Sequence, residues 1–531
     1  MRLAMTRQDT ARKTWPPPEW RAVYNLYAEH AAWYSGDPAV LLAFYVQKAG
    51  FWAQDIEAGE RRLMMHIPIA NDLARMSSRL LFSEHPKITI PTESNKATSE
   101  RLQEIIELGE VYSKLSEAAE TCAAMGGVFL KVNWDSTLAD YPLLSVAQVD
   151  NAIPEWQFGL LRKVTFWRTV KDENGALVTH VERHEPGKIF NEIWQSRSPG
   201  DLGTQIDLAT LTALTDTAPP EAEIDTGLDG LACVYVPNTR PNSRFRGLNI
   251  GQSDFHNLEG MMDSLDQAWS SWMRDIHLGL GRIMADQSFF QTDLAGQWQF
   301  NLQKEAYLGL NTIAGPGALK DQIQCNQFAI RAQEHEMTIL NLCRQIFGFA
   351  GYAPQTFGLD AHGTASSGFA LRTMERKSIM TAGTKADFWG PAVAKILEIM
   401  LQIDKLHLSK KGNPERPVVQ MQDSVVDDVM QTVQTVDQAR RATAMSLELA
   451  VQKLNPDMTH EQVAAEVKKI QDEAGANTPN PMEIGRPKPG ENVPAKPGQP
   501  GQPDGKTPVE PEEKTPAKPG QPPTPKPKET P

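Results

Sequence analysis

The chain has 531 residues, of which 40% are hydrophobic and 22% are charged, and its formal net charge is −13. This composition is typical of globular proteins, and the length predicts several domains, since single cores rarely exceed about 250–300 residues. The acidic balance argues against a protein that grips DNA through clustered Lys and Arg, although an acidic wall would let DNA slide past without sticking.

The four cysteines, Cys122, Cys233, Cys325 and Cys343, are widely spaced and form no CxxC pair. This spacing favours reduced, mostly buried thiols in a cytosolic protein. Neither the apolar segment of a signal peptide nor an apolar run of about 18 residues is present. The sequence therefore predicts a protein that is made and assembled in the cytoplasm and has no membrane span.

The first part of the chain is predicted to mix helices and strands. Apolar residues recur every three or four positions over 69–80, which predicts an amphipathic helix. A longer helix is predicted over 98–124, where it stops at Gly126-Gly127, and a strand follows over 128–134.

The next region is predicted to be rich in β-structure. Residues 164–170 are β-branched and aromatic, the turn sequence Asp-Glu-Asn-Gly occupies 172–175, and a return strand covers 177–182. The meander continues over 188–195, and residues 198–229 form a long loop with some helix.

Three long helices are predicted after residue 250. The first covers 253–285, where apolar residues step by three or four, and would be roughly 50 Å long. The second follows a polar segment and has Met337, Leu340, Cys343 and Phe347 on one face. A Gly-rich loop then leads to a third helix over 369–407, which Gly390 and Pro391 should kink because proline removes a backbone hydrogen bond.

The last folded part is predicted to be a helical pair, over 437–454 and from Thr459 onward. Beyond residue 475 the chain is rich in Pro, Gly and Lys, and one heptapeptide occurs at both 494–500 and 516–522. Such a tail cannot bury apolar surface and should be disordered. It is either a docking or spacer tail or a tolerated extension, and the sequence does not favour one of them.

The sequence offers no convincing catalytic or metal site. Phosphate-binding GxxxxGK[ST], GxSxG and HExxH motifs are absent. His180 and His184 have HxxxH spacing but fall in the predicted return strand and at its exit, where this spacing does not put both on one helical face, and they lack a third ligand. Asp423, Asp427 and Asp428 are better explained as the acidic start of a helix. We therefore predict no catalytic residue, no metal, no cofactor and no enzymatic activity.

Four segments carry a resemblance to one family. They are Val236-Pro237-Asn238-Thr239-Arg240-Pro241 with Gly251-Gln252-Ser253-Asp254 and Trp272-Met273-Arg274-Asp275-Ile276; Phe328-Ala329-Ile330-Arg331 leading to Gly351-Tyr352-Ala353-Pro354-Gln355-Thr356-Phe357-Gly358; Thr364 to Arg372 with its SGFAL stretch; and Leu454 to Thr459. Their order and spacing over about 20–475 resemble the portal proteins of tailed double-stranded-DNA bacteriophages, especially those of actinobacterial siphophages. Phe369 departs from the smaller aliphatic residue that is frequent there.

The resemblance implies an α+β portal fold with an α/β wing, a long-helix stem, a small α/β clip, a kinked long helix and a helical crown. The implied boundaries are wing 1–250, first stem helix 251–285, clip 286–326, second stem helix 327–349, tunnel loop 350–367, kinked helix 368–417, crown 418–475 and disordered tail 476–531.

The resemblance also implies three sets of site residues. The tunnel loop facing DNA would include Gly351, Tyr352, Gln355, Thr356, Gly358, Asp360, His362, Gly363 and Thr364. The stem and ring interface would include Leu265, Trp269, Trp272, Arg274, Ile276, Met337, Leu340 and Phe347, with the helix kink at Gly390 and Pro391. Because the loop has no Lys or Arg, its DNA contact would be steric and low in friction; alternatively, it is a connecting loop without a DNA role.

The function implied is a ring, dodecameric in the virion, at the capsid vertex, through which the genome is packaged and ejected. Its partners would be the large terminase subunit, the major capsid and scaffolding proteins, head-completion or adaptor proteins, and double-stranded DNA bound without sequence specificity. Another virion protein, such as a minor head protein, is the main alternative. An enzyme with an unrecognised site, such as a hydrolase, is the alternative from another class.

Overall fold

The computed structural model divides the chain into two compact units, 1–434 and 435–531, and we describe each by itself. The structure describes residues 14–46, 48, 50–53, 64–92, 94–171, 175–210, 221–279, 282–285, 291–292, 298–299, 323–326, 330–359, 368–408, 412–422, 429–455, 458 and 460–477. No helix within these ranges is both long enough and apolar enough to span a bilayer.

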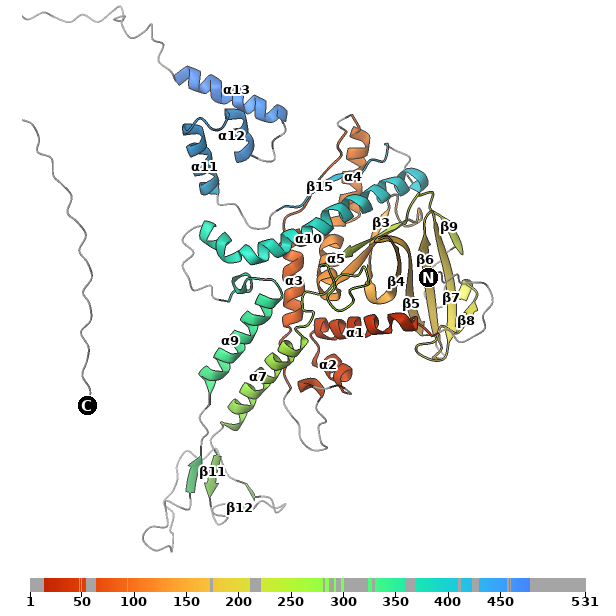
Figure 1. Cartoon of the computed structure of the whole chain (residues 1–531), viewed down its shortest axis with the longest axis vertical. Coiled ribbons are helices and arrows are strands. Elements are labelled where there is room, and N and C mark those ends of the chain that lie inside the picture. Colours follow the sequence, from red (N-terminus) through yellow and green to blue (C-terminus); the bar gives the residue numbers. More distant parts are fainter. Residues whose placement is uncertain are drawn as a thin grey trace, which may run out of the picture. The chain divides into compact units, whose positions relative to one another are not determined.

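The first unit combines helices with several antiparallel sheets (Figure 1). Its helices are α1 (Arg21–Ser35), α2 (Pro38–Tyr45), α3 (Ile69–Phe82), α4 (Lys96–Leu108), α5 (Val111–Met125), α7 (Glu259–Leu278), α9 (Ala332–Phe349) and α10 (Gly368–Ile403). Its strands are β1 (Lys87–Thr89), β2 (Gly127–Asn133), β3 (Leu143–Gln148), β4 (Ala152–Gln157), β5 (Leu160–Lys171), β6 (Leu177–Glu185), β7 (Lys188–Ser196), β8 (Thr204–Ile206), β9 (Glu223–Asp225), β10 (Cys233–Pro237), β11 (Arg282–Ala285), β12 (Gln291–Thr292), β13 (Trp298–Gln299), β14 (Ile323–Asn326) and β15 (Val418–Gln420).

A small sheet of order β10-β2-β3 separates two apolar cores. Side chains alternate between the faces of a strand. On β2, Phe129 packs into a first core with α1, α3, α7 and α9. Val128, Leu130 and Val132 pack into a second core with α4, α5 and α10. The predicted strand at 128–134 is confirmed to within a residue, and its run of apolar residues is explained because both faces are covered.

The second sheet is an antiparallel meander of order β4-β5-β6-β7-β8, and β9 also pairs with β7. The β5–β6 hairpin confirms the predicted strands on either side of residues 172–175, and β7 confirms the continuation. Lys131 on β2 contacts Glu182 on β6 over 2.9 Å, so a salt bridge links the two sheets.

One predicted helix is two helices in the structure. The sequence predicts a helix over 98–124, but α4 ends at Leu108 and α5 begins at Val111. Gly109 donates its amide to the carbonyl of Ile105, and Glu110 adopts a left-handed φ of 49°. This turn breaks the helix and lets both pieces contribute to the second core.

The first long helix is shorter than predicted. The prediction covers 253–285, whereas α7 begins at Glu259 because residues 254–257 form turns, with Asn257 at a φ of 63°. At the other end, β11 replaces helix and pairs with β14. Figure 1 shows α7 and α9 side by side with these strands beyond their ends. Apolar residues continue at helical spacing into β11. A prediction from periodicity alone therefore puts the C-terminal end of this helix too late in the chain.

The third long helix, α10, confirms the prediction closely. It is one helix through Pro391, and its second half supplies Trp389, Ile396 and Met400 to the second core. The chain then returns as β15, which pairs with β1. These contacts fasten the end of the first unit to its N-terminal half.

The second unit contains helices, of which α12 and α13 contact each other. They are α11 (Val429–Arg441), which begins within the first unit, α12 (Leu447–Leu454) and α13 (His460–Asn477). The helix predicted over 437–454 is interrupted, because Thr443 has a left-handed φ of 53° and Ser446 caps α12 by accepting from the amide of Leu449. The predicted tail beyond residue 477 lies outside the described residues.

Candidate functional site

A buried ion pair joins α10 to the segment that precedes α7. Lys385 Nζ lies 2.6 Å from Asp254 Oδ2, and both side chains are at most 2% exposed. The same ammonium donates to Ser77 Oγ in α3 over 2.6 Å and to the Tyr352 hydroxyl over 2.9 Å. An ammonium has three protons, so these acceptors satisfy it. We call these four residues, together with Asn238, the Lys385 network.

Asp254 receives hydrogen bonds from further donors. Asn238 Nδ2 donates to Oδ1 over 2.7 Å, and the Tyr352 hydroxyl donates to Oδ2 over 2.7 Å. The backbone amide of Asp254 donates to the carbonyl of Ala123 over 3.0 Å, which fixes this segment against the end of α5. Hydrogen bonds to charged groups are roughly twice as strong as neutral ones. The network thus locks α3, α5, β10 and α10 to the start of α7.

Two glycines make this close approach feasible. A Cβ on Gly251 would lie 2.1 Å from the carbonyl oxygen of Gly126, and a Cβ on Gly126 would lie 3.0 Å from the amide of Ser253. Gly126 also has a φ of 87°, which favours glycine. From the sequence, these glycines are recognisable only as a helix stop and as part of the family resemblance. A larger side chain at either position would push Asp254 away from the end of α5.

Tyr352 does not have the environment that the sequence analysis predicts. It was expected to face DNA, but its side chain is 1% exposed within a single chain. Burial, followed by the negative charge of Asp254, raises the pKa of its hydroxyl well above the usual value. Its ring meets that of Phe357 edge to face, with ring centroids 5.9 Å apart. Tyr352 therefore supports the loop from inside the fold.

The first half of the predicted tunnel loop is docked on α10. Ser378 Oγ accepts from the amide of Ala353 over 2.9 Å and lies 2.8 Å from Thr356 Oγ1. Thr381 donates to the carbonyl of Gly351 over 2.5 Å. Residues Pro354–Phe357 form a 3-10 helix, which includes the half-buried Gln355. Side-chain hydrogen bonds hold this segment in place. The glycine content of the sequence predicts mobility and gives no sign of these bonds.

The other predicted loop residues divide into two groups. Gly358 is exposed, and a Cβ built on it would meet open space. Asp360, His362, Gly363 and Thr364 lie outside the described residues.

A second buried carboxylate anchors α7. Asp266, which is 0% exposed, accepts from the indole of Trp52 over 3.0 Å and from the amide of Ile67 over 2.8 Å. Its Oδ2 also lies 2.7 Å from His66 Nδ1. The sequence analysis did not single out Asp266, although a carboxylate between apolar positions of a helix is a usable signal.

The predicted stem helices contact each other near the far end of α7. Arg331 Nη2 and His335 Nε2 lie 2.8 and 2.9 Å from Asp275 Oδ2. The contact with His335, and to a smaller extent that with Arg331, lowers the pKa of the Asp275 carboxyl below its usual value. The rings of Trp272 and His335 are nearly parallel, with centroids 6.2 Å apart. The rings of Trp269 and Trp272 meet edge to face, with centroids 5.5 Å apart. The structure therefore brings these predicted aromatic residues together within one chain.

The predicted stem set does not lie on one surface. Leu265 and Phe347 are buried in the first core, so they stabilise the subunit itself. Trp269, Trp272 and Leu340 are partly buried. Arg274, Ile276 and Met337 are exposed. Only the exposed members remain available to a neighbouring chain.

The predicted kink residues lie inside α10. Gly390 and Pro391 line a shallow depression beside β15 together with Val419. Arg416 Nη2 donates to the carbonyl of Pro391 over 3.3 Å. The helix thus continues through the proline and is braced from outside, and the kink itself stays a prediction.

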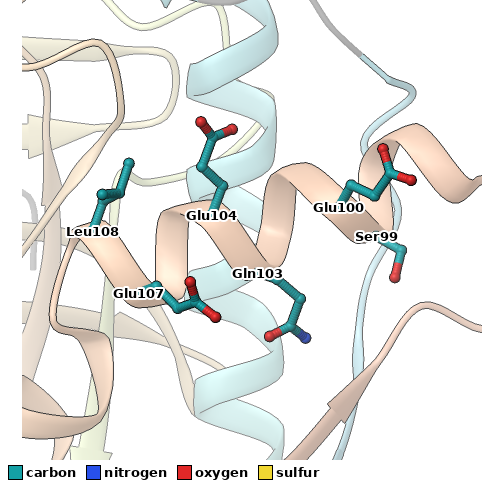
Figure 2. Close-up of a pocket in the computed structure, with 6 residues that line it drawn as sticks. All are labelled: Ser99, Glu100, Gln103, Glu104, Glu107 and Leu108. Carbon is teal, nitrogen blue, oxygen red and sulfur yellow. The ribbon is translucent and has the colours of Figure 1, made fainter.

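Another hollow runs along α4 and is strongly acidic. Figure 2 shows its lining residues, which are Ser99, Glu100, Gln103, Glu104, Glu107 and Leu108. Arg101 donates to Glu104 over 2.7 Å. All lining residues come from one helix, whereas ligand pockets gather polar groups from several elements. The carboxylates would repel phosphates, so this hollow is a poor site for DNA or nucleotides.

Both histidines of the HxxxH pair have hydrogen-bond partners within the protein. His180 lies in the predicted return strand, and β6 continues to Glu185, so that it includes His184 as well. His180 is 3.0 Å from Asn191 Oδ1, and His184 is 2.5 Å from Glu182 Oε1. Burial opposes ionisation of Glu182, but contacts with His184 and Lys131 outweigh it and hold the pKa of its carboxyl well below the usual range. Asp423, Asp427 and Asp428 lie outside the described residues.

The cysteines show no sign of reactivity among the described residues. Cys122 and Cys233 are buried and Cys343 is partly buried, and all three are free thiols. Burial raises the pKa of Cys343 to about 11 and raises those of Cys122 and Cys233 further. Such thiols remain protonated and are weak nucleophiles at neutral pH.

Comparisons with known proteins identify the family. Residues 20–480 match the model of the family described as "Phage portal protein, SPP1 Gp6-like". A chain from the neck of a native GTA particle with C12 symmetry is 11% identical, with a TM-score of 0.41, 73% of this chain covered and 90% of that one. A chain from the neck of an empty GTA particle with C6 symmetry is 12% identical, with a TM-score of 0.39 and coverages of 82% and 93%. No curated protein matches.

The family match covers most of the chain, and it includes both the Lys385 network and the α7–α9 pair. The chain belongs to the SPP1 Gp6-like family of phage portal proteins. It is thus a virion protein of a structural family, with the mixed helix and sheet architecture described above.

Proposed function

We propose that this portal protein is the subunit of a closed homo-oligomeric ring, a dodecamer in the virion, whose central channel passes double-stranded DNA into the capsid and out again. The family match over residues 20–480 is the observation that carries the proposal. A head-to-tail ring needs one surface that recognises a different surface of the next copy. The exposed side of the α7–α9 pair supports this role.

Three apolar residues of the α7–α9 pair have little cover within the described part of the chain. Ile276 is 42% exposed, Met337 is 64% exposed and Phe349 is 72% exposed. Exposed apolar side chains on these two adjacent helices support a surface that is buried on assembly. We assign them to the contact between neighbouring subunits.

The regions of the chain take the following roles in the proposal. Residues 1–250 form the wing, 251–285 and 327–349 the stem, 286–326 the clip, 350–367 the tunnel loop, 368–417 the kinked helix and 418–475 the crown. Because residues up to Phe357 are docked on α10, the part of the loop that would approach DNA narrows to 358–367. That part has no Lys or Arg, which supports a steric contact with DNA.

The partners proposed are the large terminase subunit during packaging, then head-completion proteins, with the major capsid and scaffolding proteins around the wing. Assembly would take place in the host cytoplasm. The role is mechanical and not enzymatic, which the buried, protonated thiols and the absence of catalytic sequence motifs support.

Electron microscopy of the purified full-length protein tests the ring, because class averages should show closed rings with a central channel. Met337→Asp should abolish these rings while the circular dichroism of the monomer stays unchanged, because a charge on the contact face must be desolvated. Leu138→Asp is the matched control, since Leu138 is 76% exposed in the β2–β3 turn. Rings of Met337→Asp would remove this residue from the interface, and a wild-type protein that stays monomeric would contradict the proposal.

A further inference from the structure

Three potential metal ligands converge where α1 meets the start of α7. They are His30 in α1, His256 in the turn before α7, and Glu259, the first residue of α7. One ligand atom from each lies within 4.8 Å of the other two. The planes of the two imidazoles are nearly perpendicular, at 88°, with centroids 6.0 Å apart. We call these three residues the His30 triad.

The histidines of the triad are buried without hydrogen-bond partners. His30 is 1% exposed and His256 is 8% exposed. Both ring nitrogens of each histidine, and Oε1 of Glu259, lack a hydrogen bond in the described part of the chain. Buried polar atoms are nearly always paired, and an unpaired one costs about 1–3 kcal/mol. A cluster of unpaired nitrogens around one point therefore needs an explanation.

The separation of the ligand atoms is more typical of two ligands on one metal ion than of a hydrogen bond. His30 Nε2 lies 3.4 Å from Glu259 Oε1, which is long for a hydrogen bond. Two ligands held about 2.0–2.1 Å from a tetrahedral zinc ion lie roughly 3.4 Å apart. The most distant pair of ligand atoms would have to approach by at most about 1.5 Å, which side-chain rotation can supply.

The donor set selects the class of metal. Two imidazoles and one carboxylate are typical ligands of zinc and neighbouring transition metals, whereas calcium and magnesium prefer oxygen alone. Burial first, and then repulsion from His30, lower the pKa of the His256 imidazole below its usual value. Contacts with His30 and with its own backbone amide offset the burial of Glu259 and lower the pKa of its carboxyl.

We propose that His30, His256 and Glu259 form a zinc-class transition-metal site that fastens α1 to the first turn of α7. Three protein ligands leave the fourth position of the tetrahedron for water. The site stands about one turn of α7 away from Asp263, which accepts from the amide of Phe51 over 2.8 Å. The metal would therefore strengthen an attachment that hydrogen bonds already make, and the inference does not depend on the proposed ring.

The test uses the untagged full-length protein, stripped with a chelator and then supplied with Zn²⁺ or Co²⁺ alone. After desalting, elemental analysis should find one zinc per chain. Co²⁺ should give the visible absorption bands of a tetrahedral site with nitrogen and oxygen ligands. A wild-type protein that retains no zinc, or a cobalt spectrum with thiolate charge-transfer bands, would overturn the proposal.

Matched substitutions locate the site. His256→Asn and Glu259→Gln should each weaken zinc binding at least tenfold. His277→Asn is the control, because His277 is exposed in the last turn of the same helix, and its affinity should equal that of the wild type. Circular dichroism before loading shows whether each variant folds. Zinc affinity unchanged in both folded triad variants would sink the assignment, whatever the wild-type protein binds.

Discussion

The Lys385 network and the His30 triad both bury polar groups beside the start of α7, but they satisfy them differently. Lys385 and Asp254 are opposite charges, and each has neutral hydrogen-bond partners as well. The triad leaves four ring nitrogens without a hydrogen bond. In the Lys385 network, protein atoms alone satisfy the buried polar groups. In the His30 triad, the proposed metal ion would be needed to satisfy them. The contrast teaches that buried polarity by itself does not distinguish a fastening from a binding site, but hydrogen-bond satisfaction does.

The largest effect is expected when the Lys385 network loses its cation. Lys385→Met should destabilise the protein by about 3–5 kcal/mol, because Asp254 would be left as an uncompensated buried charge. Denaturant unfolding of the purified protein measures this. Lys395→Met is the control on the same helix, since Lys395 is 45% exposed in its salt bridge with Glu398, and it should change stability by less than about 0.5 kcal/mol. Equal losses in the two variants would show that the buried pair is not important.

A smaller effect is expected when both charges are removed together. Adding Asp254→Leu to Lys385→Met should recover on the order of 2 kcal/mol, because the remaining polar partners are neutral. A double-mutant cycle from the same unfolding curves gives the coupling energy. If the double variant is as unstable as the sum of the single variants, the two charges act independently and the network is only a set of neighbours.

The hydroxyl of Tyr352 should account for about 1–2 kcal/mol, so Tyr352→Phe is expected to lose that amount. The variant also tests a pH dependence. Because the pKa of this hydroxyl is raised above 10.0 in the folded protein, the proton is held more tightly than in the unfolded chain. The resulting stability is present below pH 10 and is lost as the pH rises above it. Tyr352→Phe should therefore show a shallower alkaline loss of stability than the wild type.

The smallest effect is expected in the His30 triad without metal. His30→Leu should change the stability of the metal-free protein by less than about 1 kcal/mol in either direction, because it removes a buried polar ring that makes no hydrogen bond. In the presence of zinc, the wild type should gain thermal stability that the variant does not gain. A large loss in the metal-free variant would mean that His30 is a packed core residue and would end the contrast with Lys385.

Much of the fold could be predicted because it depends on local pattern. The β5–β6 hairpin, α3, α9 and α10 appear close to where periodicity and turn residues placed them. The errors arose where one residue overrides a pattern. Glu110 in the left-handed region divides α4 from α5, and β11 continues the apolar spacing of α7 as a strand.

Neither buried cluster could be predicted from the sequence. Each depends on contacts between residues far apart in the chain, such as Ser77 with Lys385 or His30 with Glu259. Single-sequence patterns report neighbours along a helix or strand and not across the fold. The same limit explains Tyr352, whose position in a Gly-rich segment suggested exposure although Asp254 and Lys385 enclose it.

The place of α10 in the second core has a consequence for synthesis on the ribosome. The apolar face of β2 is complete by residue 133, but Trp389 and Ile396, which cover it, follow roughly 260 residues later. Helix α5 packs on that face earlier, but at about 5–20 residues per second the cover that α10 supplies is missing for tens of seconds in the nascent chain. We therefore expect a chain ending at residue 367 to bind hydrophobic dyes and chaperones that the full chain does not bind. Folding of this subunit is then a late event, and the pool of assembly-ready copies is set by completed chains and not by partly made ones.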